Sequence, residues 1–454
     1  MSTQYAGEFD LDVCTLITSK GLTVDLRGVV YQIDFFEELE KSCITGSLTV
    51  LDTNNLLTDA QIIGQDYLQI KLSTPGTGQT IDFSENALVV YKIDKRNDIS
   101  KGGEMFMLSL ISAEALYNQR LRLSRSFTGA NSEIFEKIMT DETIINSKKS
   151  IVIEPTRGAR KHVVPNIHPF KFVNHLMRDS RSDTNGSPHY FFYETTKGFN
   201  FRTLQSLYNQ DYVMEYNDGD AGVLSEGLSK TKEVDQEYRR VIGYNISDNG
   251  DMLTAIVGGQ LGANCIKVNT YNHTYERINF SIFDNFYDFD RINGRNKNLD
   301  NPIYTESTID AEGNNLGSFT DSSSYLHTVH SDINNVDALH EGTLTENQSP
   351  HNILHRKAKM FELGSSIGAT MRVNGHCNLA VGQVIYMSRP SGGGVDAEYS
   401  GRFLIHKLRH TFLVAAKKHE ISMSIIKDSS SGKEVGNNIL PKAAGSNEQK
   451  IENY

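Results

Sequence analysis

Apolar and polar residues alternate at both ends of this chain, and that alternation limits the fold more than any other feature. The pattern is clean from Leu68 to Leu72 and again from Ile421 to Ile425, where serines separate the apolar residues. Successive side chains of a β-strand point to opposite faces, so a period of two puts one face on a core and the other in water. The sequence therefore predicts an α+β protein that is mainly β, with sheets at both ends of the chain.

The residue pattern divides the chain into six stretches. We expect a first β-barrel or sandwich over 1–115, an α/β middle unit over 116–205, a mixed β region over 206–290, a long polar loop region over 291–350, a closing β segment over 351–428 and a polar tail over 429–454. The first and fifth stretches carry the alternation, whereas the fourth is rich in polar residues and poor in aliphatic ones. The mixed region contributes either to a second β unit or to the middle unit.

Individual helices and strands are expected in the middle of the chain. Apolar residues recur at helical spacing after Asn131 and after His168-Pro169, and proline suits the first turn of a helix. The aromatic runs on either side of Lys197-Gly198 predict a hairpin that turns there. Two further strands are expected over Ile256–Asn269 and Tyr271–Ile282.

Charge and cysteine content narrow the range of functions. The net charge is −11 and the isoelectric point is about 5.7. Such a chain repels phosphates overall, which argues against a nucleic-acid-binding protein but suits a surface past which DNA slides; a moderate negative charge also simply keeps a protein soluble. The cysteines lack zinc-site or C-x-x-C spacing and are expected to be reduced, as in a protein made in a cytoplasm. They are Cys14, Cys43, Cys265 and Cys377.

The start of the chain shows no leader pattern. Its first ten residues are polar and acidic, without the basic and apolar segments of a signal peptide. No apolar run approaches the ~20 residues that a membrane helix needs. We therefore expect neither a signal peptide nor membrane insertion.

Histidines are the first candidates for a metal site. One group lies around an expected middle helix and the other near the end of the chain: His162, His168 and His175, and then His406, His410 and His419. His406 and His410 share a face of an expected strand, with Leu408 between them, but a metal would need a third ligand from elsewhere. No spacing matches the H-E-x-x-H pattern. Ordinary surface or hydrogen-bonded histidines are the simpler interpretation.

The other candidates for chemistry also have simpler explanations. The strand residues Gly375-His376-Cys377 place His and Cys on opposite faces, which prevents a nucleophilic pair. The acidic pairs Glu37/Glu38 and Asp288/Asp290 are too common to indicate glycosidase carboxylates. The run Gly392-Gly393-Gly394 lacks the flanking strand and helix of a phosphate loop, and Tyr190 to Tyr193 suit a buried hairpin better than ligand stacking. We therefore predict no catalytic, cofactor-binding or metal-ligating residues, and a protein that is not an enzyme.

Three segments resemble a known family. Ser42 to Leu57, followed by Ile63-Gly64-Gln65-Asp66, resembles the first barrel of baseplate hub proteins of contractile-tailed bacteriophages. His168 to Leu176, followed by Phe191 to Arg202, resembles their middle domain. A third set resembles their closing barrel segment: Asn374-Gly375, Leu379 to Ile385, Ser400 to Ile405 and His410. Residues 290–349 match nothing in that family.

The resemblance implies a fold, an assembly and a set of partners. Hub proteins carry two barrels similar to the tail-tube subunit, with an α/β domain between them, and assemble as homotrimeric rings. The ring joins a six-fold tail tube to a trimeric spike, contacts neighbouring baseplate proteins and lets DNA pass as non-specific cargo. The related hub of type VI secretion, in the valine-glycine repeat protein, is fused to its spike. The implied location is the virion tail baseplate, assembled in the host cytoplasm. Another tube-like component, such as a distal tail or adaptor protein, and a cell-wall hydrolase remain alternatives.

Overall fold

The computed structural model describes most of the chain. The described residues are 5–53, 55–100, 103–218, 230–269, 273–288, 290–293, 302–304, 318–329, 350–365, 367–391, 394–396 and 399–429. Apart from its first residue, Ser429, the predicted polar tail over 429–454 lies outside them, as does much of the predicted loop region over 291–350.

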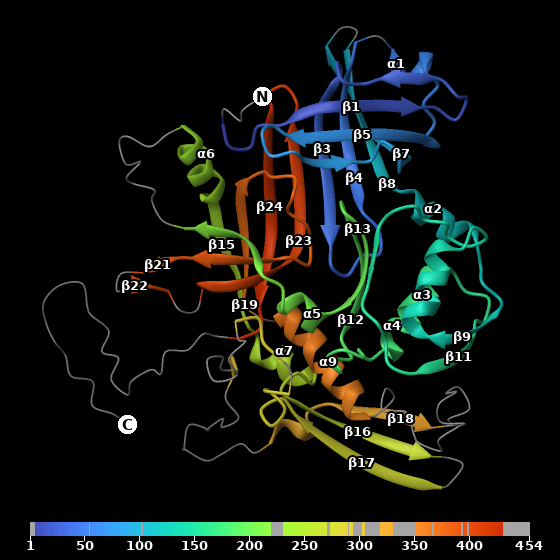
Figure 1. Cartoon of the computed structure of the whole chain (residues 1–454), viewed down its shortest axis with the longest axis vertical. Helices are drawn as coiled ribbons and strands as arrows, with labels where there is room; N and C mark the ends of the chain where they lie inside the picture. Colours follow the sequence, from blue (N-terminus) through green and yellow to red (C-terminus); the bar gives the residue numbers. More distant parts are fainter. Residues whose placement is uncertain are drawn as a thin grey trace, which may run out of the picture.

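Strands form most of the regular secondary structure (Figure 1), so the mainly β prediction is confirmed. The strands are β1 (Asp10–Ile17), β2 (Thr23–Asp25), β3 (Val30–Glu38), β4 (Thr45–Asp52), β5 (Asp66–Thr74), β6 (Gln79–Asp82), β7 (Leu88–Ser100), β8 (Gly103–Ser112), β9 (Ser126–Ala130), β10 (Ile151–Ile153), β11 (Ala159–Val163), β12 (Tyr190–Thr195), β13 (Gly198–Thr203), β14 (Tyr212–Asn217), β15 (Val241–Asn249), β16 (Gly262–Asn269), β17 (Thr274–Ser281), β18 (Ser324–Val329), β19 (Ile367–Asn374), β20 (Val384–Ser388), β21 (Pro390–Ser391), β22 (Gly394–Val395), β23 (Gly401–Leu413) and β24 (Lys418–Lys427). The helices are α1 (Leu56–Asp59), α2 (Ala113–Arg120), α3 (Asn131–Thr140), α4 (Pro169–Asp179), α5 (Leu204–Tyr208), α6 (Lys230–Arg239), α7 (Met252–Val257), the short 3₁₀ helix η1 (Phe319–Asp321) and α9 (Pro350–Ser365).

One long sheet connects the two ends of the chain. Its strands follow the order β15-β19-β24-β23-β3-β4-β8-β7-β5-β1-β2. The join is the antiparallel pairing of β23 with β3, from Lys407 opposite Glu38 to Leu413 opposite Gln32. The β signals at the two termini therefore belong to a single hydrogen-bonded surface.

The N-terminal part of this sheet curls around its own core without closing. Leu16, Phe35, Leu68 and Leu108 come from four different strands and are buried in one apolar cluster. Among the described residues no ladder joins β2 back to β3, so the sheet stays open. The prediction of closed barrels is therefore not confirmed, although the alternation did identify the inward faces correctly.

The C-terminal part of the sheet comes closer to closure. β14 pairs in parallel with β20, β20 pairs with the first residues of β23, and β24, β19 and β15 follow on the other side. An isolated bridge between Asn217 and Arg240 connects the end of β14 to the start of β15. The two open edges of this part thus meet at one point without forming a ladder.

The middle of the chain forms a small α/β unit beside the long sheet (Figure 1). Its three-stranded sheet has the order β10-β13-β12, and β9 pairs with β11 in a separate ribbon. Helix α3 begins at Asn131 and α4 begins at Pro169, as the sequence predicted. The predicted hairpin is β12–β13, in which Thr195 pairs with Gly198. Phe135, Phe192 and Phe201 pack between the helices and the sheet.

A third small sheet, β17-β16-β18, lies at the lower end of the molecule in Figure 1. Its core includes Cys265 and Phe280, which pack with residues of α9. The strand predicted over Ile256–Asn269 starts six residues late, because the capped helix α7 occupies Met252–Val257. Strand β18 lies inside the stretch predicted to be a loop, and it gains its place by parallel pairing with β16.

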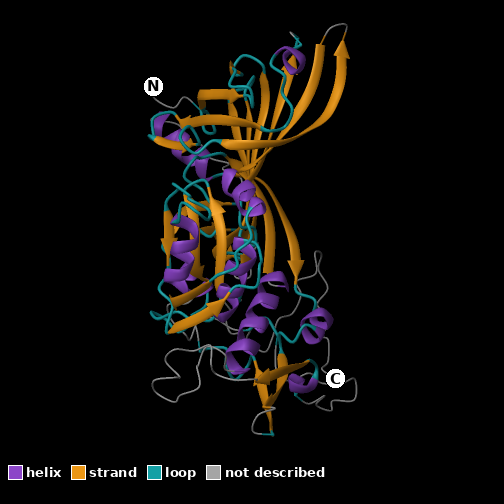
Figure 2. Cartoon of the chain, turned by 90° about the vertical axis from the view of Figure 1, so that its right-hand side faces the viewer, coloured by secondary structure: helices purple, strands orange, loops and turns teal. Residues whose placement is uncertain are grey.

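The molecule is elongated in the side view, with strands fanning out at the upper end and most helices in the lower part (Figure 2). Among the described residues, no helix combines the length and the apolar character needed to span a bilayer.

Candidate assembly surface and the joints behind it

The C-terminal histidines form a buried pair in the core. Nδ1 of His410 lies 3.0 Å from Nε2 of His419, and the His419 ring stacks on Phe412 with 3.9 Å between centroids. Burial lowers the pKa of His410 to about 3 and lowers the pKa of His419 well below its ordinary value. A bulge between Ile405 and Lys407 interrupts the strand, and His406 lies 4.0 Å from Glu40 instead of joining the pair.

The other predicted histidines have ordinary hydrogen-bond partners or face solvent. His162 Nε2 lies 2.9 Å from the Asn131 side-chain oxygen, His168 Nδ1 lies 2.9 Å from the Leu121 carbonyl, and His175 is exposed. Within the described part of the chain, no group of three His, Cys, Asp or Glu side chains is arranged to hold a metal. The absence of a metal site stays a prediction.

The structure separates the remaining candidates from one another. Cys377 is buried and its N–H donates to the Thr74 hydroxyl, while the His376 ring packs edge-on against Tyr238. The aromatic run Tyr190–Tyr193 is buried, as expected of a core hairpin. Asp290 accepts hydrogen bonds from amide side chains, and Pro390–Val395 forms a short hairpin around the predicted glycine loop, of which Gly392 and Gly393 lie outside the described residues.

A buried lysine joins the middle unit to the long sheet. Nζ of Lys149 lies 2.7 Å from Glu114 and 2.6 Å from Glu194. The other oxygen of Glu194 accepts from the N–H of Ile44 at 2.9 Å and from the Ser112 hydroxyl at 2.5 Å. Burial alone would lower the pKa of Lys149, but the two carboxylates outweigh it and raise that pKa. We call this cluster the Lys149 joint.

A buried glutamate ties three parts of the chain together. Glu37, on β3, accepts from the N–H of Thr196 in the β12–β13 turn at 2.7 Å and from the N–H of Val381 near β20 at 2.8 Å. Burial raises the pKa of Glu37 to about 7, although both backbone donors favour the charged form. Nearby, Lys197 Nζ donates to the Asn378 side chain at 2.7 Å. This second joint connects both halves of the long sheet to the middle unit.

A third joint holds helix α9 to the end of β24. Arg291 donates to both oxygens of Glu362 at 2.8 and 2.9 Å, and Lys359 lies 2.9 Å from Asp428 and 2.8 Å from Glu362. All four side chains are buried, and their charges cancel. Because a buried charge without a partner is expensive, each member fixes the position of the others.

One face of the long sheet remains polar and open to partners. We define the open face as the outward side chains of β3, β4, β8, β23 and β24. Hydroxyl groups such as Ser47, Ser109 and Thr411 share it with the apolar side chains of Met105, Met107 and Ile111, and these outward residues alternate with buried apolar ones. Asp34 lies 3.0 Å from Nε of Arg409 and accepts from the Thr411 hydroxyl at 2.8 Å. A hollow of about 750 Å³ lies on this face beside Tyr31 and Arg409.

Sequence reasoning did not identify the three joints. Their local signal was a charged residue at an inward position of an apolar run, as for Glu37 after two phenylalanines and Glu194 after four aromatic residues. Buried charges are rare unless paired, so such positions indicate a partner elsewhere in the chain. The partner itself is not visible in a single sequence, because Glu37 and Val381 are far apart along it.

Comparison with known proteins shows a shared fold. No family model matches the sequence, and no curated protein matches it. The chain is similar to a tail protein from Neisseria meningitidis, with a TM-score of 0.51 and 9% identity over 93% of this chain and 97% of that one. It is also similar to the 43 kDa tail protein of prophage MuSo2 from Shewanella oneidensis, with a TM-score of 0.50 and 9% identity over 92% of this chain and 98% of that one. The resemblance to phage tail proteins is therefore confirmed at the level of the fold.

Proposed function

We propose that this chain is a structural virion protein and not an enzyme: the central baseplate hub of a contractile tail. In this role it joins a six-fold tail tube to a three-fold spike and encloses the DNA exit channel. The observation that carries the proposal is the likeness to tail proteins across more than nine-tenths of both chains. The continuity of the long sheet supports it further, because β3 and β23 join two β parts into one surface that a ring can present to a tube.

The open face suits the wall of a channel for DNA. Its basic side chains lie next to carboxylates: Arg409 beside Asp34 at 3.0 Å, Lys407 beside Glu38 at 3.8 Å, and Lys418 beside Glu420 at 2.5 Å. A protein that neutralises phosphates with free lysines and arginines releases counterions and retains DNA. A wall of paired charges and hydroxyl groups avoids that retention.

Native mass spectrometry of the purified chain tests the assembly. One subunit has a mass of 50.8 kDa, so the hub predicts a trimer of about 152 kDa. Class averages of negatively stained particles should then show three-fold rings with a central opening. A hexamer would instead fit a tube-like ring component and contradict the hub. A protein that degrades cell walls in a zymogram would contradict the structural role.

Removing acidic partners from the open face tests the channel. The double variant Asp34→Asn/Glu38→Gln frees three basic side chains per subunit, or nine in a trimer: Arg409 loses Asp34, and both Lys407 and Lys41 lose Glu38. We expect the wild-type ring not to bind a DNA duplex, and the variant to bind it with a log–log salt slope of about −8, since each neutralised phosphate contributes about −0.9. The matched control Asp25→Asn/Asp82→Asn breaks two exposed ion pairs away from the open face. Equal DNA binding by both variants would show that the open face does not line a channel.

A further inference from the structure

Charge is distributed very unevenly along the chain. Residues 116–205 contain fourteen lysines and arginines against eight aspartates and glutamates, a net charge of +6. Residues 211–251 contain four lysines and arginines against ten aspartates and glutamates, a net charge of −6. The total of −11 hides this contrast. Two segments of equal and opposite charge within one acidic protein are therefore a feature that needs its own explanation.

The positive charge reaches the surface on the β9–β11 ribbon. Lys161 is exposed on β11, opposite Thr128, and Arg122 and Arg157 are exposed in the segments that lead into β9 and β11. Arg125 lies over the Phe127 ring and donates to the Thr143 hydroxyl at 3.3 Å, so its side chain is held in place. We call these four residues the basic flank. Beside them Val163 is 74% exposed, which adds apolar area to a charged surface.

Part of the negative charge lies on α6 and at β14. Asp211 and Asp235 are exposed, and Glu215 and Glu237 are partly so. Arg239 lies 3.2 Å from Asp235 and 4.0 Å from Glu215, and Arg240 lies 3.5 Å from Glu237. Together these two arginines offset half of the charge of the four acidic residues. We call the four acidic residues the acidic flank.

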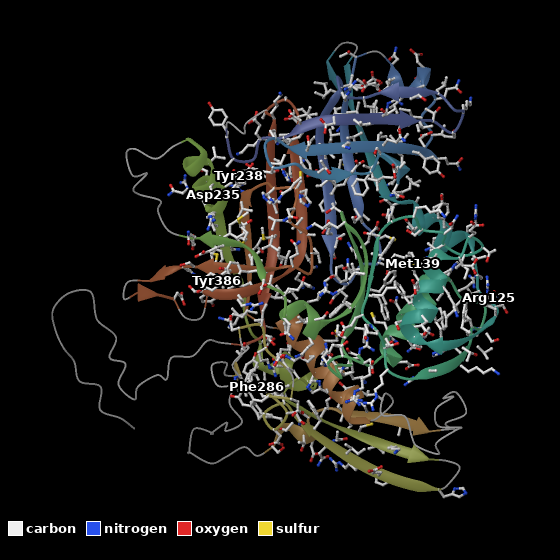
Figure 3. All side chains as sticks on the ribbon, in the orientation of Figure 1. Arg125, Met139, Asp235, Tyr238, Phe286 and Tyr386 are labelled. Atoms are coloured by element: carbon white, nitrogen blue, oxygen red, sulfur yellow. The ribbon has the colours of Figure 1, made fainter. Side chains whose placement is uncertain are left out.

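The two flanks lie on opposite sides of the molecule. Figure 3 places Arg125 on the right side and Asp235 on the left side, with the long sheet between them. They therefore cannot neutralise each other within one chain. They can do so between copies, if the right side of one copy meets the left side of the next.

We infer that the basic flank docks on the acidic flank of a second copy of this chain, in a head-to-tail contact. Such a heterologous contact closes into a ring when its rotation permits and otherwise continues as a filament. The inference rests on the proposed ring and specifies which surfaces build it. Because the two flanks differ, each copy uses both of them, and every copy in the ring is equivalent.

Electrostatics determine the orientation and the speed of this contact more than its strength. Single exposed ion pairs contribute little, whereas complementary patches steer encounter and fix the register of an interface. Exposed charges are screened beyond the Debye length, which falls from roughly 14 Å at about 50 mM salt to less than half of that at about 500 mM. The ring should therefore loosen as salt rises. An apolar interface would show the opposite trend or none.

A charge-swap experiment on the full chain tests the contact. The basic-flank variant is Arg122→Glu/Lys161→Glu, and the acidic-flank variant is Asp235→Lys/Glu237→Lys. The control for the basic-flank variant, Lys20→Glu/Lys92→Glu, makes the same change of charge as that variant on exposed residues of the N-terminal part of the long sheet. Subunit association is measured by mass photometry and analytical ultracentrifugation at about 50 mM and about 500 mM salt.

We expect each flank variant to raise the dissociation constant of the ring about 10- to 100-fold at low salt, because attraction becomes repulsion. The control should stay within about threefold of the wild type, and combining the two flank variants should restore the wild-type value. Rings that tolerate both flank variants would overturn the inference and leave the hub proposal standing. A wild-type chain that stays monomeric at low salt would overturn both.

Discussion

Replacing Lys149 with methionine tests whether the joint between the middle unit and the long sheet is ionic in the way the structure indicates. The variant keeps most of the side-chain volume but removes the charge that lies 2.7 Å from Glu114 and 2.6 Å from Glu194. Glu194 keeps its bonds from the Ile44 N–H and the Ser112 hydroxyl, so the backbone geometry survives. Two buried carboxylates are then left without a cation.

The cost of this change follows from proton uptake. Breaking a buried ion pair by removing one partner costs about 3–5 kcal/mol. The variant can limit that cost by protonating one carboxyl group, which takes about 1.36 kcal/mol for each pH unit above its ordinary pKa of 4.5. Protonation therefore limits the loss of unfolding free energy in the variant to about 4 kcal/mol at pH 7.5 and to about 1.4 kcal/mol at pH 5.5. The destabilisation should therefore shrink by more than half between these two pH values.

Urea unfolding followed by far-ultraviolet circular dichroism measures this effect at both pH values. The control is Lys148→Met. Lys148 precedes Lys149 in the sequence but is exposed, so its replacement should cost less than about 0.5 kcal/mol of stability. In the triple variant Glu114→Gln/Lys149→Met/Glu194→Gln, stability should recover in part, since no uncompensated charge remains. A loss below about 1 kcal/mol in Lys149→Met, or a loss that is equal at both pH values, would refute the reasoning.

Three further predictions concern other parts of the structure. The pKa of Glu37 is about 7 in the folded state against 4.5 in the unfolded state, so the folded state binds more protons between these values. The protein should therefore lose about 3 kcal/mol of unfolding free energy as pH rises from 4.5 to 7. In urea titrations, Glu37→Gln should flatten this dependence of stability on pH. A Cβ at Gly375 would overlap the buried His419 ring, so Gly375→Ala should lower the melting temperature by several degrees, whereas Gly243→Ala, with open space around it, should leave it nearly unchanged. Thiol titration of the unfolded, unreduced protein should find four free groups, because Cys14, Cys43, Cys265 and Cys377 form no disulfide in the structure.

The sequence was informative wherever structure depends on local pattern. The alternating segments at Leu68–Leu72 and Ile421–Ile425 lie in β5 and β24, and the proline at 169 begins α4. In each case the determining physics acts within a few residues: strand pleat, helix period or a missing N–H. The strand expected at Ile256 was wrong because Asp251 caps a helix there, with its side chain accepting from the N–H groups of Leu253 and Thr254.

The pairing of strands that are distant along the chain could not be predicted from the sequence. The sequences of β3 and β23 each predict a half-buried strand. Neither sequence specifies the other strand as its partner, since register comes from tertiary packing. The histidines show the same limit. His410 and His419 are spaced like many surface residues, and their burial becomes visible only when β23 and β24 pair. The charged flanks, by contrast, can be found by counting charges segment by segment, but the net charge of the whole chain conceals them because it sums the two segments.

The distribution of buried charge shows how the chain holds its separate parts in one arrangement. Apolar clusters fill the interior of each part, where packing tolerates small rearrangements of similar volume. The buried ionic and hydrogen-bonded groups Lys149, Glu37 and Arg291 lie instead where separate elements meet. A buried charge accepts few alternative partners, so sliding one part past another would leave it unpaired at a cost of several kcal/mol. In the proposed ring, whose copies would touch by opposite flanks, the angle between those flanks sets the curvature, and a shift at any joint would change it. On this reasoning, weakening a joint should widen the distribution of ring sizes before it unfolds the subunit.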